Sequence, residues 1–321
     1  MSRMFENKKV FVAGGRTGFV GTNLAKALLA KGAIVYAHSL NPDKPSNFTA
    51  ATTNLFESTG DLSLSANIPP AIDYVFHCAA HTAGAHEMAT NPVAQITPNV
   101  LMNSLLLEAA AKNKVKKFIF ISSSAIYPEL DIPISEDKGF EGDPPGNYFG
   151  VGWMKRYAEK LAEFYFKQYG MEVTIIRPSN IYGPYSSFDL ERAHVLPALI
   201  RRFLERQNPL EVWGTPDVVR DFIYVDDFIR GALLACEKLS GFDVCNIASG
   251  QLYTIGEAVA IIQELTGYRG AITYNSSKPM TIQQRQVDVT KASKLLGFSP
   301  EISFREGLKR TIEWYKNHSE R

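Results

Sequence analysis

The chain has 321 residues, of which 45% are hydrophobic, and its 34 basic and 33 acidic residues leave a formal net charge of +1. This length is enough for one large core, or for a core with a smaller lobe. The balanced charge and the lack of a long basic stripe argue against nucleic acid or a membrane surface as a partner.

Cysteine and histidine usage narrows the classes further. Cys78, Cys236 and Cys245 form no CxxC pair and lie in apolar segments, which is typical of buried thiols in a reducing compartment. The six histidines are scattered, so the sequence predicts no metal site. The N-terminal residues show no apolar signal region and no apolar run approaches membrane length, so we expect a cytoplasmic protein.

Short apolar strands alternate with helices through the first half of the chain. Strands are predicted over 8–15, 33–39, 73–80, 116–124 and 171–179, with helices over 18–32, 99–113 and from the 150s onward. This alternation predicts an α/β fold of the Rossmann type, with a doubly wound parallel sheet.

After Pro178, glycines, prolines and aromatic residues interrupt shorter elements, which indicates a smaller mixed α/β substrate lobe. We expect the cofactor domain over 1–178 plus about 220–248, and the substrate lobe over 179–219 and 249–321, the two being interleaved.

The segment AGGRTGFVG joins the first strand to the first helix and carries glycines at 15, 18 and 21. Glycines at this spacing permit a tight turn and let a pyrophosphate approach the backbone, while the helix N-terminus supplies amide donors. In its strand–turn–helix context, the motif predicts dinucleotide binding through Gly15, Gly18 and Gly21.

The choice of cofactor depends on the end of the second strand, where NAD-preferring sites usually place a carboxylate. His38 and Ser39 stand there instead, and Arg16 lies in the glycine-rich turn. This arrangement suits a 2′-phosphate, so we expect NADP(H) over NAD(H), with tightly bound NAD as the alternative. Asp61 and Leu62 end another segment, at a position that suits the adenine.

Several further motifs together resemble one family. They are FHCAA, Asn99, ISSSAIYP, the lysine of GWMK, RPSNIYGP, RDFIYVDD and NIASG. The chain resembles the extended short-chain dehydrogenase/reductases over nearly its whole length, and among them the branch that resembles GDP-L-fucose synthase. The resemblance implies further cofactor contacts from Phe19, Val20, Ala79, Ala80, Asn99, Lys155 and Pro178.

The family uses a Ser or Thr, a Tyr and a Lys. The hydroxyl and the phenol meet the sugar oxygen, while the lysine holds the nicotinamide ribose and lowers the pKa of the phenol. Ser123 and Lys155 match two of these positions. The tyrosine position, one helical turn before Lys155, is Val151, which has no proton to give.

Tyr148 is the leading substitute for the missing phenol, because it lies about 4.5 Å of helix rise before Val151. An ordinary aromatic residue near the start of the helix is the alternative reading. Ser124, His194 or a water molecule could also carry the proton.

A second departure concerns the cysteine and histidine with which fucose synthases epimerise the sugar. The histidine matches His194, but Ala125 stands at the cysteine position, so epimerisation at two centres is in doubt. Ser124 and Ala125 also replace the acid pair of the family's dehydratases.

The resemblance further assigns residues to a nucleotide-sugar substrate. Arginine suits diphosphate oxygens, and the positions that match are Arg202, Arg220 and Arg285, with Asn180 for the diphosphate or sugar. Trp213 is either a wall for the base or a packing residue, and His81 is a further candidate contact.

These features predict an NAD(P)-dependent epimerase or reductase that acts on a nucleotide-linked hexose by hydride transfer at C4. The sugar is expected to be GDP-linked, and a 4-keto-6-deoxy form is one candidate. The alternatives are a dehydratase that oxidises C4 transiently, and a catalytically silent nucleotide-sugar or cofactor sensor. Because the family often forms dimers through two helices, here near 100–112 and 153–168, we expect a homodimer.

Overall fold

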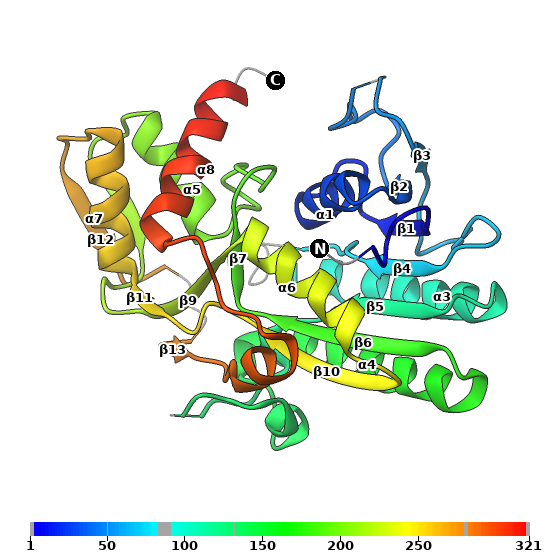
Figure 1. Ribbon diagram of the computed structural model, residues 1–321. Coiled ribbons are helices and arrows are strands. Elements are labelled where there is room, and N and C mark those ends of the chain that lie inside the picture. Colours follow the sequence, from blue (N-terminus) through cyan, green and yellow to red (C-terminus); the bar gives the residue numbers. More distant parts are fainter. Residues whose placement is uncertain (1–2, 50, 83–90, 131, 279–281, 319–321) are drawn as a thin grey trace.

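A seven-stranded parallel sheet forms the centre of the computed structural model, which describes residues 3–49, 51–82, 91–130, 132–278 and 282–318 (Figure 1). The strand order is β10-β6-β5-β4-β1-β2-β3. The strands are β1 (Lys9–Ala13), β2 (Ile34–Ser39), β3 (Leu55–Thr59), β4 (Tyr74–His77), β5 (Lys117–Ile121), β6 (Glu172–Pro178) and β10 (Phe242–Ile247). The predicted doubly wound α/β fold is confirmed.

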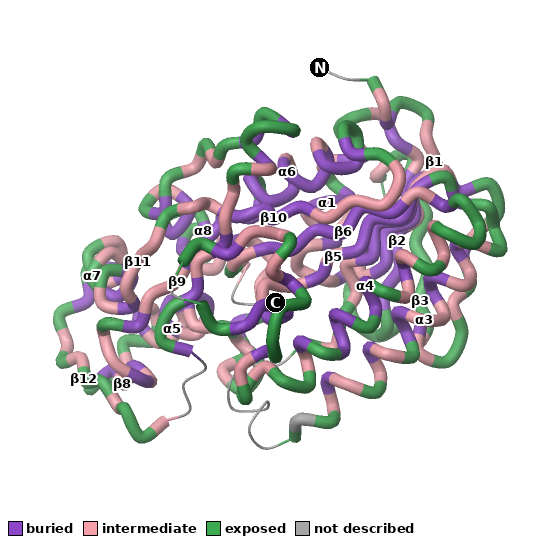
Figure 2. Tube along the Cα trace, turned by 90° about the horizontal axis from the view of Figure 1, so that it is seen from below, coloured by how far each residue is buried: buried purple, intermediate pink, exposed green. Residues whose placement is uncertain are grey.

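Helices cover both faces of this sheet. α1 (Phe19–Ala30) and α6 (Val225–Lys238) pack together on one face, and α3 (Thr97–Lys112) and α4 (Phe149–Tyr169) on the other (Figure 1). The central strands are therefore almost entirely buried, as Figure 2 shows. Burial on both sides explains why these strands read as continuous apolar runs rather than as alternating ones.

The smaller lobe contains two further sheets. One holds β7 (Asn180–Tyr182), β9 (Val219–Tyr224), β11 (Leu252–Thr254) and β13 (Gln284–Arg285), and the other pairs β8 (Leu210–Trp213) with β12 (Ile272–Asn275). Parallel and antiparallel pairs occur in the first of them, so the lobe is mixed, as predicted. Its helices are α5 (Val195–Leu204), α7 (Ile255–Thr266) and α8 (Phe304–His318).

Short helical turns lie at the loops around the sheet. They are η1 (Pro92–Gln95), η2 (Ser124–Ile126), η3 (Glu136–Phe140), η4 (Gly146–Tyr148) and the π-helical turn η5 (Ala292–Leu296). Within the described segments, no helix combines the length and the apolar character needed to cross a bilayer. The division into domains at the residues given above stays a prediction.

A buried ion pair joins the main sheet to the helix that carries Lys155. Arg177 of β6 and Glu159 of α4 are 2.6 Å apart, and their side chains are only 2% and 1% exposed. Glu159 also accepts a hydrogen bond from Ser122 Oγ at 2.5 Å. On its other side, Arg177 donates to the Tyr127 hydroxyl at 3.0 Å, which in turn donates to Asn246 of β10 at 2.6 Å. The network fixes α4, β6, β10 and the segment after β5 relative to one another.

Because the pair is buried, removal of one partner leaves an uncompensated charge. We expect Glu159→Ala to lower the free energy of unfolding by about 3–5 kcal/mol. Glu163 lies one turn further along α4 and pairs with the exposed Lys160 and Lys167, so Glu163→Ala is the matched control and costs at most about 1 kcal/mol. Denaturant unfolding measures both, and equal losses in the two variants would contradict the assignment.

Candidate active site

The turn between β1 and α1 brings helix and strand unusually close. Gly14 has a φ of +81°, and a Cβ added at Gly18 or Gly21 would lie 2.5 or 2.2 Å from the Gly14 carbonyl oxygen. Any side chain at these two positions would push α1 away from the strand. The turn therefore presents bare backbone and the N-terminus of α1, which is the geometry that a pyrophosphate requires.

This turn lies at the point where the strand order of the sheet reverses. β1 pairs with both β2 and β4, and a Cβ at Gly14 would lie 3.0 Å from the amide nitrogen of Ala79, just beyond β4. In open α/β sheets, ligands bind at this crevice beyond the carboxyl ends of the strands. The other predicted cofactor residues lie at or just beyond strand ends, or in the first turn of a flanking helix: Phe19, Val20, His38, Ser39, Asp61, Leu62, Ala79, Ala80, Asn99 and Pro178.

At the end of β2, His38 is buried between the strands. One ring nitrogen, Nδ1, is 2.9 Å from Ser58 Oγ, and the other, Nε2, is 3.0 Å from the Gly60 carbonyl oxygen. Burial lowers the pKa of His38. The ring is therefore neutral, with Nε2–H donating to Gly60 and Nδ1 accepting from Ser58, and it supplies no charge to a cofactor.

Beside His38 lies a hollow of about 290 Å³, lined in part by Thr59, Gly60, Asp61 and Ser65. Asp61 Oδ1 accepts hydrogen bonds from the Ser63 hydroxyl at 2.6 Å and from its amide at 2.8 Å, and these bonds lower the pKa of the Asp61 carboxyl. The Leu62 side chain is buried in the core beneath. The hollow lies where the sequence predicts the adenine.

Arg16 projects from the glycine-rich turn toward the first residues after β2. Its amide donates to the His38 carbonyl oxygen at 3.4 Å, and its NH1 donates to the Lys44 carbonyl oxygen at 2.7 Å. Its Nε is 3.5 Å from the carboxylate of Glu57 on β3. Glu57 was not among the predicted site residues, because no local pattern connects position 57 with position 16.

Lys155 and Ser123 both lie at the end of β5, Lys155 through a hydrogen bond to its last residue and Ser123 two residues beyond it. Lys155 Nζ donates to the Ile121 carbonyl oxygen at 2.9 Å and lies 4.6 Å from the centroid of the Phe120 ring. Burial lowers its pKa to about 8, while Glu159 acts in the opposite direction. Ser123 Oγ accepts the Ala125 amide at 3.0 Å and so shapes the turn η2.

The start of α4 packs directly on this turn. A Cβ at Gly152 would lie 2.7 Å from the Ala125 carbonyl oxygen, so only glycine allows the approach. Val151, the neighbouring residue, is half-buried and carries no acidic proton. Val151 is therefore next to the Ser123 turn but has no proton to donate.

Tyr148 lies at the N-terminal end of α4 and faces the arginines rather than open solvent. Its ring centroid is 5.2 Å from Cζ of Arg285, and NH1 of Arg285 donates to the Ser124 carbonyl oxygen at 2.7 Å. The phenol is partly buried. Arg285 thus connects Tyr148 with the turn that holds Ser123 and Ser124.

Two predicted substrate arginines lie side by side on paired strands. Arg220 of β9 is in register with Arg285 of β13. Burial lowers the pKa of both guanidinium groups, that of Arg285 to about 10, and the charge of Arg220 contributes to the second shift. The two buried guanidinium groups have lost hydration and repel each other. A bound anion would offset both unfavourable effects. Asn180 is exposed nearby on β7 and donates to the Asp221 carbonyl oxygen at 2.8 Å.

The remaining predicted residues form two other groups. Arg202 of α5 lies 5.6 Å from the ring of Trp213, and Lys278 approaches the same ring at 5.4 Å. His194 is the N-cap of α5 and is an exposed residue. His81 is fixed by Asn99, whose side chain accepts the His81 amide and donates to its carbonyl oxygen, both at 2.9 Å.

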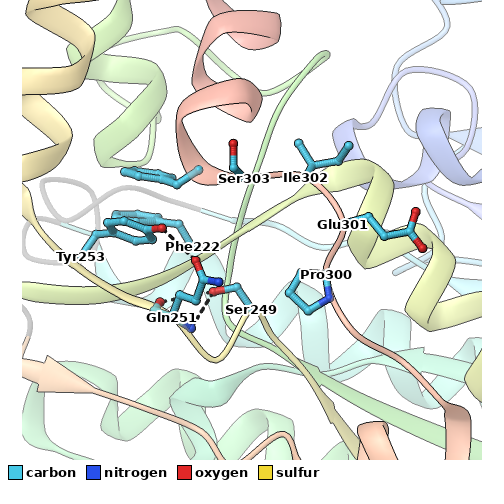
Figure 3. A pocket seen from close by; sticks show the side chains of 9 residues that line it. Phe222, Ser249, Gln251, Tyr253, Pro300, Glu301, Ile302 and Ser303 are labelled. Atoms are coloured by element: carbon cyan, nitrogen blue, oxygen red, sulfur yellow. Dashed lines mark hydrogen bonds between the residues drawn. The ribbon is translucent and has the colours of Figure 1, made fainter.

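Figure 3 shows a second hollow, of about 200 Å³, which contains none of the predicted site residues. Its polar side chains bond to one another and to the protein: the Tyr253 hydroxyl donates to Gln251 at 2.8 Å, and Ser249 Oγ donates to Asp221 at 2.7 Å. Stacked rings of Phe222, Phe304 and Tyr253 form its apolar wall. We assign it a structural role in the lobe.

Comparison with known proteins agrees with this geometry. Residues 10–248 match the NAD dependent epimerase/dehydratase family. The chain belongs to this family. It is 33% identical to the probable GDP-L-fucose synthase 1 of Oryza sativa subsp. japonica, over 96% of this chain and 92% of the relative. With the GDP-L-fucose synthase of Escherichia coli K12 the identity is 31%, over 98% of each chain.

Among solved structures, the UDP-glucuronic acid 4-epimerase of Bacillus cereus, in complex with UDP-glucuronic acid and NAD, has a TM-score of 0.82. The two chains are 28% identical, with 96% of this chain and 99% of that chain covered. The epimerase/dehydratase family membership makes the protein an NAD(P)-dependent enzyme of the extended short-chain dehydrogenase/reductase type.

The lowered pKa of Lys155 predicts a pH-dependent cost of burial. Its pKa is about 8 in the folded protein, against 10.5 for an unperturbed lysine, so the unfolded chain binds the proton more tightly. The buried ammonium therefore destabilises the fold fully below pH 8, and the cost disappears as the pH rises to 10.5. We expect Lys155→Met to be more stable than the parent at pH 7, by on the order of 3 kcal/mol.

The quantity to measure is the difference in unfolding free energy between Lys155→Met and the parent. The contributions of the other titrating groups to the pH dependence are the same in both proteins and cancel in this difference. It should shrink between about pH 8 and pH 10. A difference that grows over this range, or does not change, would show that Lys155 is not buried as an ammonium.

Proposed function

We propose that the protein is a nucleotide-sugar epimerase/reductase that binds NAD(P) at the carboxyl edge of the large sheet and a GDP-linked hexose between this edge and the smaller lobe. A 4-keto-6-deoxy sugar is the candidate substrate, in line with the relatives named GDP-L-fucose synthase. The observation that carries the proposal is the desolvated pair Arg220 and Arg285, one of which is hydrogen bonded to the turn of Ser123 and Ser124.

The residues present fit a bound nicotinamide cofactor, because bare glycine backbone and a helix N-terminus face the place of its pyrophosphate. When bound, the nicotinamide supplies the acceptor or donor of hydride at C4. Lys155 holds the nicotinamide ribose and keeps a positive charge near the reacting oxygen, and Ser123 orients that oxygen.

On the substrate side, Arg220 and Arg285 bind the diphosphate, aided by Asn180. Arg202 adds a further cation, Trp213 offers its ring to the base, and His81 contacts the sugar. Tyr148 is the first candidate for proton transfer, followed by His194 and Ser124.

For the cofactor we propose a preference for NADP(H). Arg16 is the one cation that the glycine-rich turn itself contributes, and the neutral His38 replaces the acid that usually binds the ribose of NAD. We place the enzyme in the cytoplasm, where reducing conditions suit three cysteines that are free in the structure.

A panel of nucleotide sugars in deuterated water tests the reaction. Epimerisation at C3 or C5 exchanges solvent deuterium into that carbon, epimerisation at C4 by hydride transfer gives a new sugar without exchange, a reductase consumes NAD(P)H with a 4-keto sugar, and a dehydratase labels C6. Val151 is the one observation that favours a binding protein without turnover. That alternative predicts binding of nucleotide sugar and cofactor with no exchange, no consumption and no new sugar, and this result would overturn the proposal.

Single mutations can distinguish a catalytic role of Tyr148 from the roles of the tyrosines in α4. We expect Tyr148→Phe to lower turnover by about 10²- to 10⁴-fold, the span typical of a lost general acid or base, with the KM for the nucleotide sugar changed much less. Tyr157→Phe on the neighbouring helix α4 is the control, because Tyr157 is 51% exposed. If Tyr148→Phe turns over like the parent, proton transfer belongs to His194, Ser124 or water.

We also propose that the protein is a homodimer through α3 and α4. A stripe of large side chains on α4 is exposed at helical spacing: Phe149 (53%), Trp153 (41%), Tyr157 (51%) and Phe164 (48%). Such a stripe on a surface helix marks an interaction site, and its extension along α4 beside α3 fits a second copy of the same helices.

We expect the double variant Tyr157→Asp, Phe164→Asp to be monomeric in size-exclusion chromatography with light scattering, since two buried charges would oppose the contact. Tyr274→Asp, at an exposed aromatic residue of β12, should leave the dimer intact. A parent protein that is already monomeric at high concentration would refute the dimer.

A further inference from the structure

The Arg16 side chain is held in a short network of opposite charges and carbonyl groups. Its side chain is only 14% exposed, and its Nε faces Glu57 Oε1 at 3.5 Å. The same carboxylate oxygen accepts a hydrogen bond from Ser46 Oγ, which fixes its position. Glu57 therefore occupies the side of the guanidinium that would otherwise be available to a phosphate.

The segment after β2 closes over the glycine-rich turn and completes this site. Lys44 Nζ donates to the Thr17 carbonyl oxygen at 3.3 Å, and Asn47 donates from its side chain to Thr22 Oγ1 at 2.9 Å. Two other charged side chains belong to this network: Lys44, whose ammonium bonds the Thr17 carbonyl oxygen, and Glu57, which pairs with Arg16. The only negative charge among these side chains is that of Glu57.

A 2′-phosphate and a 2′-hydroxyl meet this acid very differently. The phosphate carries about −1.5 to −2 charges at pH 7, whereas the hydroxyl carries none. To bind Arg16, the phosphate has to displace Glu57 or lie beside it. Repulsion between the negative phosphate and the negative carboxylate is unfavourable in a partly buried site. The hydroxyl can approach the same place, and can donate a hydrogen bond, without that penalty.

We propose that Glu57 is a specificity-determining residue for the cofactor: it limits the NADP(H) preference that Arg16 creates and preserves binding of NAD(H). This inference rests on the proposed cofactor site. In this protein, the acid that influences the choice of cofactor is then Glu57 of β3, which reaches Arg16. In the usual arrangement, that acid lies at the end of β2.

Fluorescence titration of the full-length protein with NADPH and with NADH tests it. Glu57→Gln should tighten NADPH about ten-fold, the order expected when one like charge near a phosphate is removed, and leave the Kd for NADH within about two-fold. Glu57→Ala should give the same change in the ratio, and Glu57→Asp, which keeps the charge, should stay close to the parent. The effect should diminish at high salt.

Glu172→Gln is the matched control, because Glu172 of β6 forms an ion pair of the same length, 3.5 Å, with Lys117 elsewhere on the sheet. It should change neither affinity. If Glu57→Gln changed the Kd for NADPH and the Kd for NADH by the same factor, so that their ratio stayed the same, the role of Glu57 would be overturned while the cofactor site stayed in place. A parent protein that binds neither NADPH nor NADH would overturn both.

Discussion

The buried pair of Arg177 and Glu159 is the interaction on which the active-site end of the sheet depends. Through it a strand, a helix and the Ser122 hydroxyl are held at hydrogen-bond distance. Buried pairs of this kind contribute little net stability but are costly to break. Their value here is geometric, because Ser122 precedes Ser123 in the chain and Glu159 lies one helical turn after Lys155.

Helix α4 consequently serves three environments at once. Its inner side holds Glu159, its edge carries Lys155, which donates to the Ile121 carbonyl oxygen, and the turn η4 just before it places Tyr148 against Arg285. The outward stripe of aromatic residues is left for another surface. Val151 lies on the same helix, and its side chain, which has no acidic proton, leaves the contacts of Lys155 and Tyr148 in place.

The parts of the molecule that the sequence predicted well are those set by local patterns. The glycines at 15, 18 and 21 and the continuous apolar strands reflect contacts within a few residues, and the large sheet followed from them. The contacts of Arg16 with Glu57 and of Tyr148 with Arg285 join positions far apart in the chain. Nothing in the residues themselves specifies such pairs, because they arise only when the strands take their places in the sheets.

The strand order has a consequence during synthesis of the chain. β10 forms the edge beside β6, and its Asn246 completes the hydrogen bonding of Tyr127, yet it is made long after its neighbours. At about 5–20 residues per second, the ribosome needs several seconds to pass from the end of β6 at Pro178 to the start of β10 at Phe242. For that interval β6 is itself the edge of the nascent sheet, and an open strand edge of this kind can pair with other chains until β10 covers it.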